Sequence, residues 1–436
     1  MARVYLKILF LLLVTEVCNA QVVFKSVEDV WGYADTHNIT IRTAQYEAEK
    51  ASLSKMQAYG SLLPQASISG SYTDNTAIPT NIIDGSIFGA PGTYRILKLG
   101  QQFVYTGSFN AQMDILNLQN IFNAQVAKRT EEMNKASLAN TKKTTYQQVA
   151  TQFYSYLLML EAARLARESE RAADSIYQSV NNKFKEGLVS QANVDVAKLN
   201  MERTEQTYIT AQYQMLTAKN NLKALLGMSL KDSLDIQSVL QDNLISEEGK
   251  GFQEDPAIKF AYAQVRMAQS QYRAANGAFA PTLSIVYNNT STQYDSIYRP
   301  GTNAVPFFPA TYWALRANLP IFTGGTRYYQ SKKNKINYLE SKEQFESAQK
   351  QSAINDENIK LSYARSQAVL EKAKNVMELG FDNYVHISYK YEQGVSSIED
   401  RLKAFSDYID YQNAYLNSLS DMLVQLYQIK IRQQSF

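Results

Sequence analysis

Side chains that could carry out chemistry on their own are scarce in this 436-residue chain. It contains two histidines, His37 and His386, which are far apart and lack a neighbouring ligand pattern, so we interpret both as helix-surface residues. No P-loop, G-x-S-x-G or H-E-x-x-H motif occurs. Acidic residues such as Glu131 and Glu132 belong to charge patterns that are typical of a solvated helix face. We therefore expect no catalytic residue, no metal site and no cofactor, and an enzyme is not predicted.

The only cysteine, Cys18, belongs to an amino-terminal stretch that is typical of export. Arg3 and Lys7 give the start of the chain a positive charge, and an apolar run follows at 8–14. Cys18 and Ala20 are small residues, as a signal peptidase requires for cleavage after Ala20. This pattern predicts a signal peptide over 1–20. Cys18 could instead accept a lipid, but Val17 precedes it where a small residue is required. A cut after Ala20 leaves a mature chain without cysteine, which excludes disulfides and thiol catalysis.

Composition narrows the class of protein further. The net charge of +3 is too close to neutral to indicate nucleic-acid binding. After the signal peptide, no apolar run approaches the roughly 18 residues that a transmembrane helix needs. An exported protein can still enter a membrane as a β-barrel.

The clearest elements are strands in which apolar and polar residues alternate. The stretch 103–115 alternates over about a dozen residues, and 312–319 does the same before Pro320. This period of two, at this length, is typical of a tilted transmembrane strand with one face toward lipid. Shorter alternations at 66–73 and 282–288 predict two further strands, and 74–102 and 288–310 are expected to be loops. The residues predicted to face lipid are Phe103, Tyr105, Phe109, Trp313 and Leu315.

Long helices are predicted between and after these strands. One helix is expected over about 27–62 and another over about 118–186, which at 1.5 Å per residue is on the order of 100 Å long. Gly187 is the expected C-cap, and Ser190 or Asn193 is expected to start the next helix, which ends near Gly227.

The order of elements occurs twice along the chain. Gly60 and Pro64 match Gly277 and Pro281 at a shift of 217, and KFKEG at 183 matches KYEQG at 390. We therefore predict one protomer over 21–436 built of two repeats, about 21–228 and 252–436, joined by a polar connector at 229–251. Four strands cannot close a barrel, because closure needs about eight. The chain must share a barrel with copies of itself.

A motif in the second repeat resembles a known family. W-x-L-x-x-x-L-P-I-F-x-G-G, from Trp313 to Gly325, resembles the second-half signature of the TolC family of outer-membrane channel proteins. The resemblance implies a mainly α protein with a transmembrane β-barrel shared between protomers and a long α-helical barrel in the periplasm. It also implies a homotrimer in the outer membrane that binds a periplasmic adaptor and, through it, an inner-membrane pump or ABC transporter.

The same resemblance assigns roles to the two helix–helix turns, 183–195 and 390–401. It implies an adaptor-docking site at Gly187, Leu188, Val189, Gly394 and Val395. It also implies a periplasmic aperture, with candidates Asn193, Asp195, Asp400 and Arg401. In some members of the family an acid and a basic partner form a charged latch at the aperture. Asn193 and Ser396 stand at these two positions here, so this sequence departs from the charged pair. Asp400 has a second interpretation, as a first-turn acid favoured by the helix dipole.

The expected function is the outer-membrane exit duct of a tripartite efflux pump or a type I secretion system, in which transport is passive. The alternative is a periplasmic adaptor or a coiled-coil structural protein. An adaptor also contains a helical hairpin, but it would need β-rich domains and would not repeat its plan twice.

Overall fold

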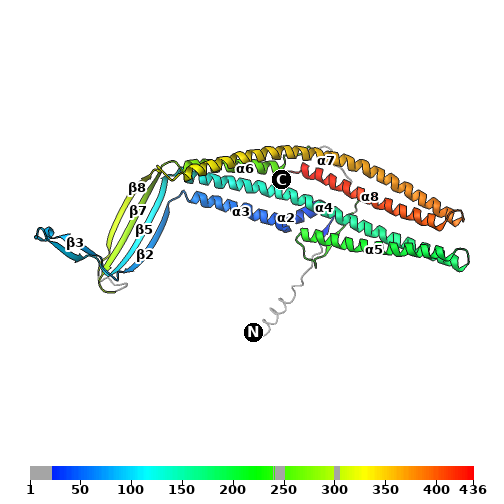
Figure 1. Cartoon of the computed structure of the whole chain (residues 1–436), viewed down its shortest axis with the longest axis horizontal. Coiled ribbons are helices and arrows are strands. Elements are labelled where there is room, and N and C mark those ends of the chain that lie inside the picture. Colours follow the sequence, from blue (N-terminus) through cyan, green and yellow to red (C-terminus); the bar gives the residue numbers. More distant parts are fainter. Residues whose placement is uncertain (1–21, 239, 241–250, 299–304) are drawn as a thin grey trace, which may run out of the picture. The chain divides into compact units, whose positions relative to one another are not determined.

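The computed structural model describes residues 22–238, 240, 251–298 and 305–436 (Figure 1). The predicted signal peptide, with Cys18, lies outside the described residues, and so do residues 239 and 241–250 of the predicted connector. The chain divides into two units. We call 49–133 and 262–344 the sheet unit, and the described parts of 1–48, 134–261 and 345–436 the helical unit.

The sheet unit is built on four antiparallel strands, as the alternating stretches predict. They are β2 (Gln65–Asp74), β5 (Phe103–Leu116), β7 (Thr282–Asp295) and β8 (Phe308–Asn318), in the order β2-β5-β7-β8 (Figure 1). Tyr287 on β7 lies opposite both Ala111 on β5 and Trp313 on β8. Since paired residues share a face, the alternating apolar residues of β5 and β8 lie on the same side of the sheet.

Two expected loops are partly wrong. β7 continues through 288–295 and β8 begins at Phe308, although 288–310 was predicted to be a loop. In 288–295 polar residues occupy both faces of the strand, so apolar and polar residues do not alternate there. The strand is held instead by hydrogen bonds between polar side chains of β5 and β7. Asn288 donates to Asn110 at 2.8 Å, and the Ser108 and Thr290 hydroxyls lie 3.1 Å apart.

The other expected loop, 74–102, contains a hairpin. It comprises β3 (Thr80–Asp84), the 3₁₀-helix η1 (Gly85–Phe88) and β4 (Tyr94–Lys98). Its strands are five residues each, too short for an alternation to stand out from the surrounding turn residues.

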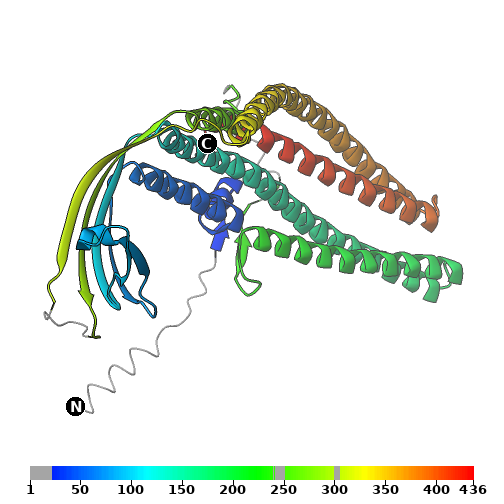
Figure 2. The same cartoon turned by 60° about the vertical axis from the view of Figure 1, so that its left-hand side comes forward.

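Seven helices occur in the described residues (Figures 1 and 2). They are α2 (Val27–His37), α3 (Ile39–Gly60), α4 (Leu118–Lys185), α5 (Gln191–Leu225), α6 (Pro256–Gly277), α7 (Thr326–Glu392) and α8 (Ile398–Gln433). None of the helices in this described part is both long enough and apolar enough to cross a membrane.

The single helix expected over 27–62 is wrong, because the chain breaks at Asn38. Its backbone is extended, with φ −65° and ψ 127°. Its side chain accepts from the amide of Ile41 at 3.0 Å and donates to the carbonyl of Leu225 at 2.6 Å. The first bond caps α3, and the second ties the break to α5.

The core of the helical unit collects aromatic and aliphatic residues from both repeats. Trp31 of α2 stacks on Tyr146 of α4, with ring centroids 5.0 Å apart, and its indole N–H donates to the Tyr146 carbonyl at 3.0 Å. Leu222 of α5 and Leu423 of α8 are fully buried in the same cluster. The predicted connector also contributes to it. Its strand β6 (Leu234–Ile236) pairs in parallel with β1 (Val22–Phe24). Leu234 and Ile236 of this strand are buried in the cluster.

Candidate functional site

Both predicted helix–helix turns close with the same backbone geometry. α4 ends at Lys185, and Gly187 follows with φ 76°. The amide of Gly187 donates to the Phe184 carbonyl at 2.9 Å and that of Leu188 to the Lys183 carbonyl at 2.9 Å. The positive φ favours glycine, because an L-residue brings its Cβ close to the following carbonyl there. The predicted C-cap at Gly187 is confirmed, and Ser190 is the N-cap of α5.

The second turn repeats this arrangement between α7 and α8. Gly394 has φ 72°, and its amide donates to the Tyr391 carbonyl at 3.0 Å. The amide of Val395 donates to the Lys390 carbonyl at 2.9 Å. Leu188 and Val395, each directly after its glycine, are 69% and 75% exposed. Each turn therefore presents one apolar side chain to the outside at an equivalent position.

The two turns are joined by an apolar cluster with an ion bridge beside it. Val180 of α4, Val194 of α5 and Ile398 of α8 are buried together, and Val189 packs on them. Glu392 accepts from the Lys183 amine at 3.1 Å and from the Arg401 guanidinium at 3.0 Å. Because Glu392 contacts a cation from each hairpin, it links the two turns.

The ring of Tyr391 supports this bridge. The Lys183 amine lies 4.5 Å and the Arg401 guanidinium carbon 5.1 Å from its centroid, within range of a cation–π contact. Of the residues in this bridge, Arg401 was predicted from the sequence as a site residue, whereas Lys183, Tyr391 and Glu392 were not. A signal was present, because the aligned turns carry opposite charges at Lys185 and Glu392.

Asp400 lies in a capping box at the start of α8. Its carboxylate accepts from the Ser397 hydroxyl at 3.0 Å, the Ser397 amide at 3.2 Å and the Ser396 hydroxyl at 3.2 Å. These hydrogen bonds, those from Ser397 most of all, hold the pKa of the Asp400 carboxyl below its usual range. In this chain Asp400 therefore acts as an acid in the first turn of a helix, which is the second of its two predicted roles. Its role at the aperture stays a prediction.

The aperture candidates of the first hairpin make local contacts at the start of α5. Asp195 accepts from the Gln191 amide group at 2.9 Å, and the Asn193 side chain contacts the Ser190 hydroxyl. The structure thus places all four candidates within the first five residues of α5 or of α8.

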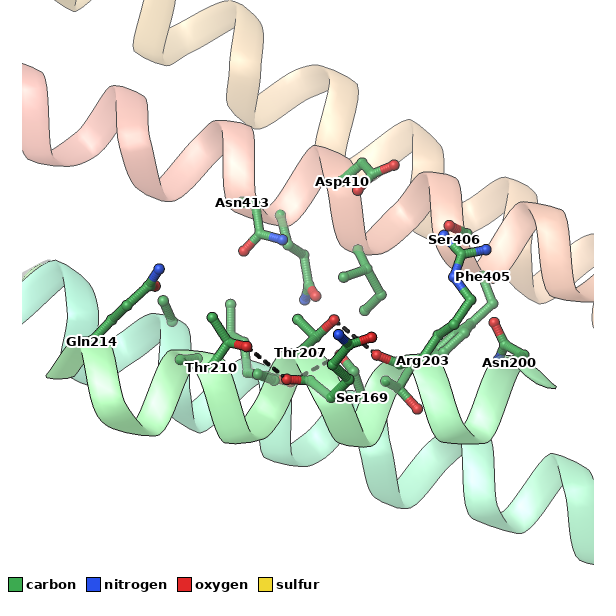
Figure 3. Close-up of a pocket in the computed structure, with 18 residues that line it drawn as sticks. Ser169, Asn200, Arg203, Thr207, Thr210, Gln214, Phe405, Ser406, Asp410 and Asn413 are labelled. Atoms are coloured by element: carbon green, nitrogen blue, oxygen red, sulfur yellow. Dashed lines mark hydrogen bonds between the residues drawn. The ribbon is translucent and has the colours of Figure 1, made fainter. Parts of the chain in front are cut away.

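A groove in the helical unit lies between α4, α5 and α8 (Figure 3). Its volume is about 440 Å³, and small or polar side chains line it together with Leu165, Phe405 and Ile409. The hydroxyls of Ser169, Thr207 and Thr210 donate to carbonyls of their own helices at 2.8–2.9 Å. The hydroxyls are thus engaged within their helices, and Arg203 and Asp410 supply the charge of the lining. None of the predicted site residues lines it.

Other chemistry-bearing residues are dispersed. His37 and His386 are both exposed on helices, and His37 stacks on Tyr33 with ring centroids 3.9 Å apart. Within the described ranges, no three His, Cys, Asp or Glu side chains come together as a metal site.

The residues predicted to face lipid share one face of the sheet. Trp313 and Leu315 are 73% and 57% exposed on β8, and Phe109 is exposed on β5. Phe103, at the far end of β5, is partly covered by Tyr298, with ring centroids 5.7 Å apart. Contact with lipid stays a prediction for all five.

Comparison with known proteins gives consistent matches. The family model described as outer membrane efflux protein matches residues 34–228. The probable efflux pump outer membrane protein TtgC of Pseudomonas putida is 26% identical over 187 residues, 41% of this chain. That alignment spans only 37% of the length of TtgC. The outer membrane protein TolC of Escherichia coli is 20% identical over 429 residues, covering 93% of this chain and 81% of TolC.

Solved structures share the fold of more than nine-tenths of the chain. The outer membrane protein VceC of Vibrio cholerae aligns with a TM-score of 0.74 at 16% identity, over 94% of this chain and 96% of VceC. CusC, described as forming a transmembrane channel, aligns with a TM-score of 0.77 at 15% identity, over 93% and 91% of the two chains. These likenesses establish a mainly helical architecture with a strand-built part.

Proposed function

The chain belongs to the TolC family of outer-membrane channel proteins, and from that premise we propose that it is the exit duct of a tripartite efflux pump or type I secretion system. It resides in the outer membrane of a Gram-negative bacterium and extends into the periplasm. Transport through it is passive, and the cargo is selected by the pump and the adaptor. The described order α3-β2-β5-α4-α5 and α6-β7-β8-α7-α8 supports a single protomer over 21–436 made of two repeats. The signal peptide at 1–20 is part of the proposal and rests on the sequence pattern alone.

The observation that carries this proposal is the open edge of the sheet. Among the described strands, β2 pairs only with β5 and β8 only with β7, so each has one unpaired edge. In hydrocarbon each unpaired backbone group costs several kcal/mol. Pairing β8 of one copy with β2 of the next satisfies these groups. Three copies, the number that the family implies, close a barrel of twelve strands.

The helical unit supports the same association. Exposed apolar residues follow three- and four-residue spacing on α5, and a second exposed series lies on α7. Those on α5 are Ile209, Tyr213 and Leu216, and those on α7 are Val369, Val376 and Leu379. Such stripes are typical of helices that pack against a partner, and a neighbouring copy would cover them.

The partners beyond the trimer are a periplasmic adaptor and, through it, an inner-membrane pump or ABC transporter. The exposed apolar residues Leu188 and Val395, with Gly187 and Gly394 before them, support adaptor docking at the two turns. A helix tip can approach closely where a glycine lacks a side chain.

The shared barrel is tested by cysteine cross-linking in outer membranes. We expect disulfide-linked copies when Ala314→Cys on β8 is combined with one of Ser67→Cys, Ser69→Cys or Ser71→Cys on β2, since Cα atoms of facing edges come within about 7 Å. Ser108→Cys with Ala314→Cys is the matched control, because β5 is paired on both sides. A monomer in the soluble periplasmic fraction would refute the proposal.

The register of the lipid face gives a second expected result. Phe109 lies near the middle of β5, and Phe109→Arg is expected to destabilise the inserted trimer by about 2–4 kcal/mol, as arginine does at the midplane of a bilayer. Asn110→Arg, one residue along and on the opposite face, is expected to cost far less. Unfolding of the trimer in lipid vesicles measures both, and equal losses would reject the assigned face.

The aperture role of Asp400 is tested by conductance. Three copies of this carboxylate around one axis would attract cations, so Asp400→Ala is expected to reduce cation selectivity in planar bilayers or to raise leak. Glu399→Ala is the matched control, because Glu399 is the neighbouring acid in the same turn and is absent from the capping box. If Asp400→Ala leaves selectivity and leak unchanged, the aperture lies elsewhere.

A further inference from the structure

All four connections between helices and sheet lie at one end of the sheet. α3 leads into β2 at Gln65, which pairs with Gln112 near the end of β5. α6 leads into β7 at Thr282, which pairs with Asn318 at the end of β8. The end of α3, the start of α4, the end of α6 and the start of α7 therefore meet the same sheet end within the sheet unit (Figure 2).

These four helix ends contain no acidic residue. The stretches 50–60, 118–130, 262–277 and 326–339 lack aspartate and glutamate, although the whole chain carries 41 acids against 44 bases. The cations in them are Lys50, Lys55, Lys128, Arg129, Arg266, Arg273, Arg327, Lys332, Lys333 and Lys335. The four helix ends thus carry only positive charge, and Asp114, near the end of β5, is an acid at the same end of the sheet, where it accepts from Asn117 and Asn120.

Some of this charge is neutralised by acids that lie just beyond the stretches. Lys55 pairs with Glu131 at 2.7 Å, and Arg129 and Arg266 pair with Glu132 at 2.6 and 3.8 Å. Five of the other cations are exposed. In the described part of the chain, no carboxylate oxygen lies within 4.0 Å of these five side chains. We call these the basic cluster: Lys128, Arg273, Lys332, Lys333 and Lys335.

Contacts between α6 and α7 bring most of the basic cluster together. The Ser331 hydroxyl lies 2.6 Å from the Asn276 side-chain oxygen, and the Asn334 amide group donates to the Gln271 carbonyl at 3.4 Å. Arg273 therefore lies beside the turns of α7 that carry the three lysines.

Exposed apolar residues precede the three α7 lysines of the basic cluster along the chain. Ile321 and Phe322, in the link between β8 and α7, are 94% and 88% exposed. Tyr328 and Tyr329 follow in the first turn of α7, and the Lys332 amine lies 5.4 Å from the ring centroid of Tyr328. The order strand, apolar pair, aromatic pair and lysines matches the order hydrocarbon, interface and headgroups across one side of a bilayer.

We propose that the basic cluster and the link before it bind anionic phospholipids of the periplasmic leaflet, with the lysines on the phosphate groups and Ile321 and Phe322 at the hydrocarbon edge. The proposal rests on the membrane insertion proposed above. At 1.5 Å per residue Lys332 lies about 9 Å along α7, within reach of the headgroup layer for a flexible lysine.

A second copy of the chain is a poorer partner for these lysines. The sheet-end half of α3, which leads into edge strand β2 and would lie beside α7 of a neighbour, has no acid between 50 and 60. A neighbour would therefore add positive charge here and leave the lysines without a counter-ion. Phosphate groups of lipid supply that counter-ion.

Lipid binding is measured on the full trimer in nanodiscs that mix phosphatidylglycerol with phosphatidylcholine. Native mass spectrometry counts the lipids that remain bound after the disc is released. We expect the wild type to retain phosphatidylglycerol preferentially. The variant K332Q/K333Q/K335Q is expected to bind it about 100-fold more weakly, from the attraction of three lysines to an anionic surface. The control K342Q/K350Q/K372Q removes equal charge farther along α7 and is expected to behave as the wild type.

The outcomes separate the two proposals. Insertion without a preference for phosphatidylglycerol, or equal loss in both triple variants, would overturn the lipid site and leave the channel proposal intact. Displacement of bound phosphatidylglycerol by millimolar inorganic phosphate would identify a free-anion site and would also overturn it. Failure of the wild type to enter nanodiscs would overturn both proposals.

Discussion

Replacing Asp255 with alanine is expected to lower the free energy of unfolding of the helical unit by about 3–5 kcal/mol, the cost of leaving one partner of a buried ion pair alone. The side chain of Asp255 is 4% exposed and that of its partner Lys143 is 14% exposed. Both carboxylate oxygens accept from the Lys143 amine at 2.8 Å. The carboxylate also accepts from the Ser352 hydroxyl at 2.9 Å and from the Ala257 amide at 2.9 Å.

Asp255 therefore links α4, α6 and α7, and the alanine variant loses all of these contacts at once. Chemical denaturation followed by helical circular dichroism measures the effect. Asp421→Ala is the matched control, because the pair Arg365–Asp421 is 3.5 Å long and its side chains are 68% and 51% exposed. Such a surface pair is worth up to about 1 kcal/mol. Similar losses for the two variants would mean that burial of Asp255 contributes nothing.

The same pair gives a pH dependence with a defined sign. Burial alone would raise the pKa of the Asp255 carboxyl, but hydrogen bonds from Lys143, the Ala257 amide and Ser352 outweigh it and hold the pKa below its usual range. Because the pKa is lower in the folded state, the carboxylate stabilises the fold at pH values above its unfolded-state pKa of about 3.9. This contribution is lost as the pH falls through the folded-state pKa. The difference between wild type and Asp255→Ala should be full at pH 7 and shrink below about pH 4.

Substituting valine for Gly394 or Gly187 is expected to abolish export while the trimer still assembles. Both glycines have positive φ, where an L-residue costs roughly 1–2 kcal/mol and a β-branched one is a genuine outlier. A Cβ at either position meets no atom within 4 Å in this chain, so the variants should fold. The strain instead moves the turn and the exposed Leu188 or Val395, which changes the surface proposed for the adaptor.

Two comparisons sharpen this test. Gly394→Asn should retain more export than Gly394→Val, because asparagine tolerates the left-handed region. Gly89→Val, at φ 76° with no atom within 4 Å, places the same strain in the β3–β4 hairpin and should leave export normal. An export assay beside trimer quantification gives the answer. Full export by both turn variants would place adaptor docking elsewhere.

Local patterns along the sequence determined the elements and their repetition. Alternation in 103–115 gave the faces of β5, because the side-chain period of a strand is two and pairing preserves it. Gly187 and Gly394 marked both turns, since few other residues adopt a positive φ. These features depend on residues within a few positions of each other, so they could be predicted without a structure.

Partners far apart in sequence decided the rest. The break at Asn38 combines a local cap, the bond from the Ile41 amide, with a bond to the carbonyl of Leu225, 187 residues away. The ion pair of Asp255 depends on Lys143, 112 residues earlier, and the bridge of Glu392 to Lys183 spans 209 residues. An acid in a polar stretch of sequence gives the same local signal whether it is solvated or buried. Only the packing of the helices brings its cation within hydrogen-bond distance and removes the water, and that is why these contacts emerged from the tertiary structure alone.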